Sequence, residues 1–229
     1  MASMTDNAAK WQDDGQKMPY GENGHLMTSN DMARVDGRDC EGCDICCHGM
    51  GDTIKINPYD AFLLMKNLHK SFDELTEICI DFSVDDGLIL PYMRMTGEDE
   101  HCVFLGENGR CSIHDFRTCL CRLFPLGRDY DCETHEMRYF VLEGACRKKN
   151  LTKIKIKKWL GTPQLEKNEA FLKDWHYFIK AQKVLAASAG SEERMKLISM
   201  KLLNTFYRCR YDLDGDFYAQ YERTKDTFC

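Results

Sequence analysis

The sequence predicts a mainly α-helical protein with short β segments, in which a loop-rich cysteine-cluster domain precedes a C-terminal helical hairpin. Three observations lead to this fold class. Eleven of the 13 cysteines lie between residues 40 and 146. Apolar residues recur at helical spacing in the last third, and short capped or β-branched segments lie between the cysteine groups. With 229 residues, 43% of them apolar, the chain can bury a core without disulfides.

Three segments are predicted. Residues 1–36 lack periodic apolar spacing and are expected to form a flexible or loosely docked N-terminal arm. The cysteine-cluster domain is placed at residues 37–150 and a C-terminal helical segment at residues 151–229. The arm has no apolar run typical of a secretory signal, and no stretch of 18 apolar residues occurs anywhere. We therefore expect a cytoplasmic protein in a reducing compartment.

Short elements are predicted between the two cysteine groups. Asn57-Pro58 is typical of a helix N-cap followed by proline at the first helical position. Ser71 and Glu74 form a capping box for a second short helix. Gly49 and Gly51 indicate backbone with positive φ or a close approach to another group. Strands are expected at residues 53–56, 88–95 and 136–143, and a capped helical turn at 112–115.

The last third is predicted to contain two amphipathic helices separated by a break at Gly190-Ser191. Their apolar residues follow helical spacing: Phe171, Trp175, Phe178, Ile179 and Leu185, then Met195, Ile198, Leu202 and Phe206. We interpret these side chains as core. The run Asp212–Asp216 is similar to a calcium loop, but its glycine is misplaced, so a turn is predicted.

The first cysteine group places Cys40, Cys43 and Cys46 at C-x-x-C-x-x-C spacing, with Cys47 directly after. This spacing lets three thiolates converge on one metal centre, as in bacterial ferredoxins. The side chains of Cys46 and Cys47 are expected to diverge, because adjacent residues project in different directions. We therefore expect the pair to serve two centres, or one of the two to stay unligated.

The second group completes the predicted ligand set. The eight predicted metal ligands are Cys40, Cys43, Cys46, Cys47, Cys102, Cys111, Cys121 and Cys146. Eight thiols suffice for two four-cysteine centres, or for one centre with a thiol pair beside it. Cys119 and Cys132 are candidates to line the site, whereas Cys79, Cys209 and Cys229 are left out. His48 and His114 lie near cysteines and are possible ligands, although a structural role is favoured.

Spacing favours iron–sulfur over zinc. Structural zinc sites usually combine two C-x-x-C knuckles, and only the first group has that spacing. The predicted cofactor is one or two iron–sulfur clusters, of the [4Fe-4S] type, with zinc as the alternative. Arginines within the second group could neutralise thiolates and tune a reduction potential, or could pair with nearby aspartates. These are Arg110, Arg117, Arg122 and Arg128.

Charge limits the partners. The net charge of −6 argues against general nucleic-acid binding. The absence of a long apolar stretch argues against a membrane as partner. Residues 147–158 nevertheless contain seven basic residues and no acid. We favour a solvated face beside an anionic thiolate site, with contact to an acidic partner or phosphate as the alternative. The expected partner is another protein, either a redox partner or a modification target.

Several motifs accompany the cysteines: Gly51-Asp52, Asn57-Pro58-Tyr59-Asp60, Cys102-x-Phe104-Leu105, Cys111-Ser112-Ile113-His114, Arg117 and Cys121-Arg122-Leu123-Phe124-Pro125. Together with Cys40-x-x-Cys43-x-x-Cys46-Cys47, they resemble the CxxCxxCC cysteine-cluster family, also called YkgJ-like. The resemblance covers residues 40–146 and implies zinc or iron chelation. Flagellin lysine-N-methylases have a similar cluster that is associated with a [4Fe-4S] centre.

Three functions follow from these observations. The first is an iron–sulfur protein that transfers electrons or assists the modification of a protein or peptide. The second is a group transferase, such as a protein methylase, that carries a cluster, although no S-adenosylmethionine signature is visible. The third is a structural zinc-binding protein.

Overall fold

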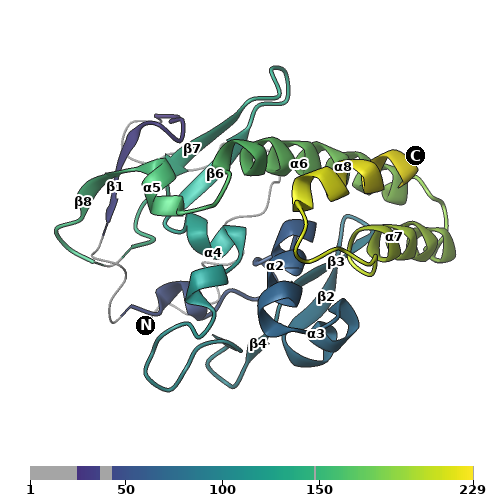
Figure 1. Cartoon of the computed structure of the whole chain (residues 1–229), viewed down its shortest axis with the longest axis horizontal. Helices are drawn as coiled ribbons and strands as arrows, with labels where there is room; N and C mark the ends of the chain where they lie inside the picture. The colour runs from purple at the N-terminus through teal and green to yellow at the C-terminus, as the bar shows by residue number, and fades with distance from the viewer. Residues whose placement is uncertain (1–24, 37–42, 147, 229) are drawn as a thin grey trace. The chain divides into compact units, whose positions relative to one another are not determined.

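The computed structural model describes residues 25–36, 43–146 and 148–228 (Figure 1). The chain forms two compact units. Unit 1 comprises Met1–Gly51, Met95–His114 and Cys119–Leu165, and unit 2 comprises Asp52–Arg94, Asp115–Thr118 and Glu166–Cys229. The segment between the two cysteine groups therefore lies in the same unit as the C-terminal helices. The predicted domain boundaries, which divide the chain along the sequence, stay a prediction.

Unit 1 consists of short elements arranged around two-stranded antiparallel sheets, in which β1 pairs with β8, β4 with β5 and β6 with β7. Its elements are β1 (Met32–Asp36), η2 (Ile45–Cys47), β4 (Met95–Thr96), β5 (His101–Cys102), α4 (Cys119–Leu123), β6 (Leu126–Tyr130), β7 (Met137–Val141), β8 (Thr152–Lys155) and α5 (Ile156–Leu160). The short η3 (His114–Phe116) crosses from unit 1 into unit 2.

The core of unit 1 brings together residues distant in sequence. The buried cluster contains Met27, Ala33, Val35, Leu123, Leu126, Tyr139, Ile156 and Leu160. Met27 and Tyr139 also exchange two backbone hydrogen bonds of 2.8 Å each. Met27, Ala33 and Val35 thus anchor residues 27–36 on the core, whereas the first 24 residues of the predicted arm lie outside the described residues.

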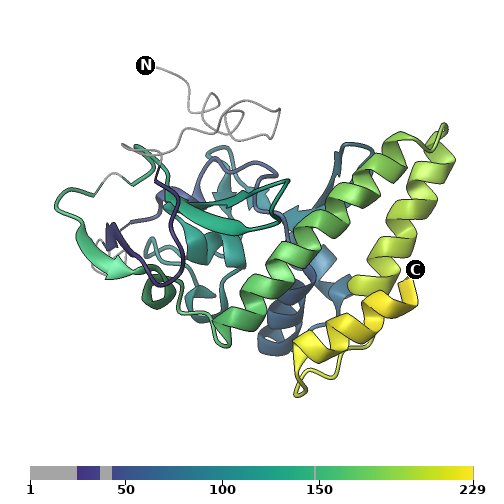
Figure 2. The same ribbon diagram turned by 90° about the horizontal axis from the view of Figure 1, so that it is seen from above.

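Unit 2 is mainly helical. Its elements are α2 (Pro58–Leu68), α3 (Phe72–Ile78), β2 (Ile80–Asp85), β3 (Leu88–Met93), α6 (Leu165–Ala187, beginning at the last residue of unit 1), α7 (Glu192–Phe206) and α8 (Phe217–Phe228). Figure 2 shows the long α6 and α7 joined by a short turn. Aromatic rings form the core, with Trp175 of α6 centred 5.1 Å from Phe206 of α7 and Phe171 4.8 Å from Tyr221 of α8.

The mainly helical class with short strands is confirmed, while the loop-rich character and the hairpin arrangement stay predictions. Both predicted capping boxes are present, at Asn57 for α2 and at Ser71 for α3. The predicted strand at residues 53–56 is wrong, because only Lys55 forms an isolated bridge, to Tyr92. Of the helices described, α5 and α8 were absent from the sequence prediction.

The structure contains no helix, within the residues that it describes, with the length and apolar character needed to cross a membrane.

Candidate metal centre

The first cysteine group surrounds a single turn of 3-10 helix. Cys43 and Cys46 are half-buried and Cys47 is buried, with the Cys47 N–H donating to the Asp44 carbonyl at 2.7 Å. This tight turn brings the Sγ atoms of Cys46 and Cys47 to 3.9 Å. The two thiols are therefore neighbours, in contrast to the divergence expected from their adjacency in the sequence. Cys40 lies outside the described residues.

A backbone link connects this turn to the second cysteine group. The Gly49 N–H donates to the Glu100 carbonyl at 2.9 Å, and His48 forms an antiparallel bridge with His101. Gly49 and Gly51 adopt the predicted positive φ, at 61° and 52°. A residue with a Cβ would be strained there, so glycine permits the chain to turn along β5. Because His48 follows Cys47 and His101 precedes Cys102, the bridge brings these two cysteines near each other.

The loop after Cys102 folds back on itself to deliver Cys111. The Leu105 N–H donates to the Cys102 carbonyl, and the Ser112 N–H donates to the Phe104 carbonyl, both at 2.8 Å. Leu105 and Cys111 form an antiparallel bridge. The spacing of Cys102 and Cys111 thus corresponds to a small hairpin-like loop. An open hollow beside it is lined by Gly106, Glu107, Asn108, Arg110, Cys111 and Ser112.

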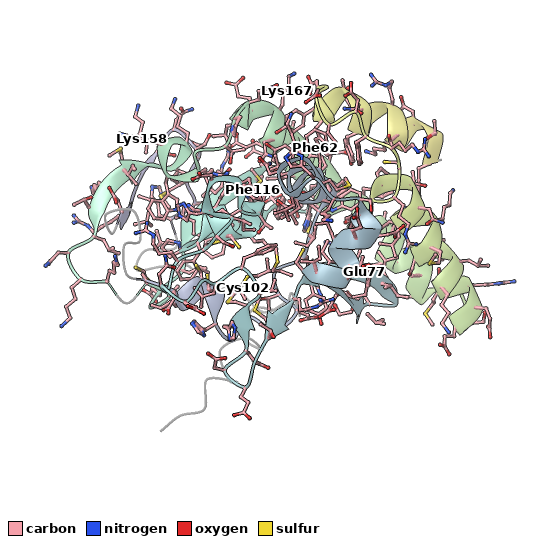
Figure 3. All side chains as sticks on the ribbon, turned by 60° about the horizontal axis from the view of Figure 1, so that its bottom comes forward. Phe62, Glu77, Cys102, Phe116, Lys158 and Lys167 are labelled. Atoms are coloured by element: carbon pink, nitrogen blue, oxygen red, sulfur yellow. The ribbon has the colours of Figure 1, made fainter. Side chains whose placement is uncertain are left out.

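Electrostatic coupling shows that four thiols share one neighbourhood, which we call the thiol group: Cys46, Cys47, Cys102 and Cys111. The contact with Cys46 raises the pKa of Cys47, and burial and the charges of the other three thiols raise it further. Burial raises the pKa of Cys102, partly offset by a backbone hydrogen bond from Phe104, with Cys111 and Cys46 adding to the rise. Without a metal, Cys47 and Cys102 stay protonated at neutral pH. Figure 3 labels Cys102 within unit 1.

Histidines and carboxylates lie beside the thiol group. The Asp99 Oδ1 atom lies 2.6 Å from Nδ1 of His101, and its Oδ2 atom lies 3.7 Å from Nδ1 of His48. The Nε2 atom of His48 lies 3.3 Å from Oδ2 of Asp44. Asp99 thus bridges the histidines next to Cys47 and Cys102. Sequence reasoning named His48 and missed His101, although the adjacency of His101 to Cys102 mirrors that of His48 to Cys47.

The other predicted ligands occupy different elements of unit 1. Cys121 is half-buried on α4, and Cys146 is half-buried after β7. Cys119 is buried on α4, two positions before Cys121, so the two side chains leave the helix about 200° apart. Cys132 is exposed between β6 and β7, and His114 begins η3. No disulfide joins the cysteines that the structure describes.

Arg128, one of the four arginines predicted to lie among the thiolates, interacts electrostatically with Cys119. Burial lowers its pKa, but Tyr130, Cys119 and Tyr139 more than offset this effect, and the net pKa is raised. Its Nε atom is buried without a hydrogen-bond partner among the described residues. Arg128 therefore places a fixed positive charge near Cys119 inside unit 1.

The thiol group is not a closed coordination sphere as it stands. Among described His, Cys, Asp and Glu side chains, no three are positioned to hold a metal ion together. The donor type nevertheless fits, because thiols from separate segments are the ligands that zinc and iron–sulfur centres prefer. The predicted ligation by eight cysteines stays a prediction.

A family model, CxxCxxCC, described as "Putative zinc- or iron-chelating domain", matches residues 39–163. The chain belongs to this family. The match spans all eight predicted ligands and extends through β8 and α5. Neither a curated protein nor a solved structure matches the chain significantly. Membership of the CxxCxxCC family supports metal binding by the cysteine-rich part of the chain and admits both zinc and iron.

Proposed function

We propose that the protein holds an iron–sulfur cluster, of the [4Fe-4S] type, and serves in electron transfer or as an accessory to the modification of another protein. The observation that carries this proposal is the thiol group. Three separate stretches of chain bring Cys46, Cys47, Cys102 and Cys111 into one electrostatically coupled neighbourhood. Clustered, partly buried thiols are costly to ionise together, and a bound metal centre supplies the compensating charge.

The cysteines of unit 1 supply more donors than one ion needs. We propose Cys40, Cys43, Cys46, Cys47, Cys102, Cys111, Cys121 and Cys146 as the set from which ligands are drawn. Four thiolates complete one cubane, so this set holds one or two clusters. The C-x-x-C-x-x-C spacing of Cys40, Cys43 and Cys46 supports an iron–sulfur cluster. The group-transferase alternative stays a prediction from sequence.

One distance favours zinc as a second candidate. Two thiolates bound to one tetrahedral ion at about 2.3 Å each lie about 3.8 Å apart. The Sγ atoms of Cys46 and Cys47 are 3.9 Å apart. In a cubane, each thiolate binds a different iron, so neighbouring ligands are farther apart. A structural zinc ion would therefore use the adjacent pair together, whereas a cluster would use one of the two.

Analysis of protein purified without oxygen distinguishes the two candidates. Iron and acid-labile sulfide in equal amounts, with a visible chromophore that bleaches on reduction by dithionite, support the iron–sulfur proposal. One zinc per chain without sulfide overturns it in favour of the structural zinc site. Protein that is metal-free and fully folded contradicts both.

A further inference from the structure

The β1–β8 sheet carries a positively charged face. We call Arg34, Lys153, Lys155, Lys157 and Lys158 the basic ribbon; all five side chains are exposed. Ala33 and Val35 of β1 are buried, and Ile154 of β8 is half-buried on the same side. The alternation of a strand then places Arg34, Lys153 and Lys155 on the outer face. Figure 3 shows Lys158 pointing outward from α5.

The register sets like charges opposite each other. Arg34 pairs with Lys153, and Ala33 pairs with Ile154. The Ile156 N–H donates to the Asp31 carbonyl at 3.0 Å, so Asp31 and Ile156 form a hydrogen-bonded pair of the ladder. Because the positions alternate along an antiparallel pair, Arg34 and Lys153 occupy a non-hydrogen-bonded position, where side chains are closest. Like charges directly opposite destabilise a sheet.

These cations are not neutralised within the described chain. None of the five forms an ion pair with a described residue; Arg34 donates to the Leu151 carbonyl at 3.0 Å, and Lys157 donates to Asn30 Oδ1 at 2.9 Å. The repulsion between Arg34 and Lys153 therefore persists in the isolated protein. An anionic partner would relieve it, which provides a driving force for binding at this face.

The ribbon adjoins the cysteine-rich region at one end of its pairing. Asp36 pairs with Thr152. In the sequence, Cys40 follows Asp36 by four residues and Cys146 precedes Thr152 by six. Six residues span at most about 20 Å, so Thr152, at this end of the ribbon, lies within that distance of Cys146.

We propose that the basic ribbon docks an acidic surface of a partner protein beside the cysteine-rich region. A protein is favoured over nucleic acid for two reasons. The whole chain carries a net charge of −6, so an extended polyanion would meet repulsion beyond the ribbon, whereas a compact acidic patch would not. The neighbouring Trp159 is half-buried and its indole N–H donates to the Phe124 carbonyl at 3.2 Å, so it is not a stacking platform for bases. Such small, charge-steered interfaces are typical of redox pairs.

The docking itself does not depend on the identity of the metal, but the redox or modification role of the partner rests on the proposed function. The test therefore uses the full chain purified without oxygen, with its metal content measured on the same sample. Poly-L-glutamate short enough to lie on the ribbon alone and a longer DNA duplex are titrated into nitrogen-15-labelled protein. Amide shifts are followed at low and physiological salt.

The variant Lys153→Gln with Lys155→Gln should bind poly-L-glutamate about fivefold more weakly, as expected for two lost surface charge contacts. The matched control, Lys173→Gln with Arg223→Gln, removes two exposed cations from unit 2 and should bind like the native chain. Lys153→Gln alone should also unfold at an equal or higher denaturant concentration, because it removes the cross-strand repulsion.

Shifts confined to residues 32–36 and 152–158, with loss of binding only in the ribbon variant, support the proposal. It is overturned by absent glutamate binding at low salt, by equal loss in both variants, or by tighter binding of DNA than of poly-L-glutamate at this face. Metal analysis that contradicts the iron–sulfur cluster while the ribbon still binds glutamate overturns the proposed function alone.

Discussion

The thiols of Cys47 and Cys102 are held in environments that disfavour the thiolate. Cys46 contact and burial raise the pKa of Cys47, and burial raises that of Cys102. A metal binds the thiolate, so binding at these positions must release protons. Metal affinity at the thiol group should consequently rise as pH rises through the neutral range, when the competing proton becomes scarcer.

Replacing Cys46 and Cys47 together tests whether the thiol group holds the metal. Cys46→Ser with Cys47→Ser removes both of the neighbouring sulfurs, which lie 3.9 Å apart, and we expect bound metal to fall by at least about tenfold after dialysis against a chelator. Metal content per folded chain measures the loss. Cys132→Ser, at the exposed turn between β6 and β7, is the control and should retain the native content. Equal retention in both variants would refute the assignment.

A carboxylate outside the thiol group gives a defined pH dependence. The Ser71 backbone N–H, assisted by Lys70 and the Ser71 hydroxyl, lowers the pKa of Glu74 from 4.5 to about 2. Because the folded-state pKa is depressed, Glu74 stabilises α3 above pH 4.5, and this contribution is lost as pH falls toward about 2.

Glu74→Gln should therefore unfold more easily than the native chain at pH 6 and differ from it less at pH 2. Urea unfolding at a series of pH values, followed through α-helical circular dichroism, measures this convergence. Glu77→Gln, an exposed residue of the same helix, is the control. If the free energies of unfolding of the native chain and of Glu74→Gln do not converge with acidification, the capping carboxylate is not the cause of the difference.

Among the elements, the β6–β7 hairpin depends on one missing side chain. Gly127 of β6 lies opposite Phe140 of β7, and a Cβ on Gly127 would come within 2.3 Å of the buried Phe140 ring. A ring at such a distance must move, and overpacking of this kind costs about 1–3 kcal/mol. The gain from restricting the unfolded chain is smaller, about 0.4–1 kcal/mol.

Gly127→Ala should accordingly destabilise the protein by about 1–2 kcal/mol, the balance of these two effects. Denaturant unfolding monitored by tryptophan fluorescence measures the change. Gly106→Ala provides a comparison, since its Cβ would meet no atom closer than 3.1 Å. An unchanged midpoint for Gly127→Ala would show that β7 shifts freely away from β6.

Local signals predicted elements well where capping chemistry was explicit. The boxes at Asn57 and Ser71 and the break before Glu192 identified α2, α3 and α7, because caps act within one helical turn. α8 escaped prediction because Asp212–Asp216 was considered only as a turn, although the Asp216 carboxylate accepts from the Tyr218 N–H at the start of this helix. β1 escaped because its partner β8 lies over a hundred residues away.

The sequence predicts the chemistry of the candidate site but not which of its cysteines lie together. The spacing of Cys40 to Cys47 indicates a soft-metal site, and the family match supports that chemistry. The coupling of Cys47 to Cys102 arises from the Gly49–Glu100 link, a long-range backbone contact that no sequence periodicity encodes. The position of His101 beside the thiol group likewise follows from its backbone bridge to His48.

At the scale of the molecule, the thiol group and the aromatic core belong to different units. Cys46, Cys47, Cys102 and Cys111 lie in unit 1, whereas Trp175, Phe206 and Tyr221 form the core of unit 2. Metal binding should therefore stabilise one unit more than the other. Free energy of metal binding adds to folding only where the ligands lie.

Removal of the metal should increase amide hydrogen exchange in residues 43–51 and 95–114 and leave that of α6, α7 and α8 nearly unchanged. Exchange followed by mass spectrometry of peptides, before and after chelation, measures both regions in one sample. An equal increase in amide hydrogen exchange in both units would show that they unfold cooperatively.

The pairing of Ala33 with Ile154 also fixes when unit 1 can assemble. During synthesis, β1 leaves the ribosome long before β8 exists, so its hydrogen-bonding edge waits for more than half of the chain to be translated. The cysteines emerge within that interval, before the sheet that closes their unit has formed. Any reductant or chaperone that protects the nascent thiols must therefore act on a chain in which β1 has not yet paired with β8.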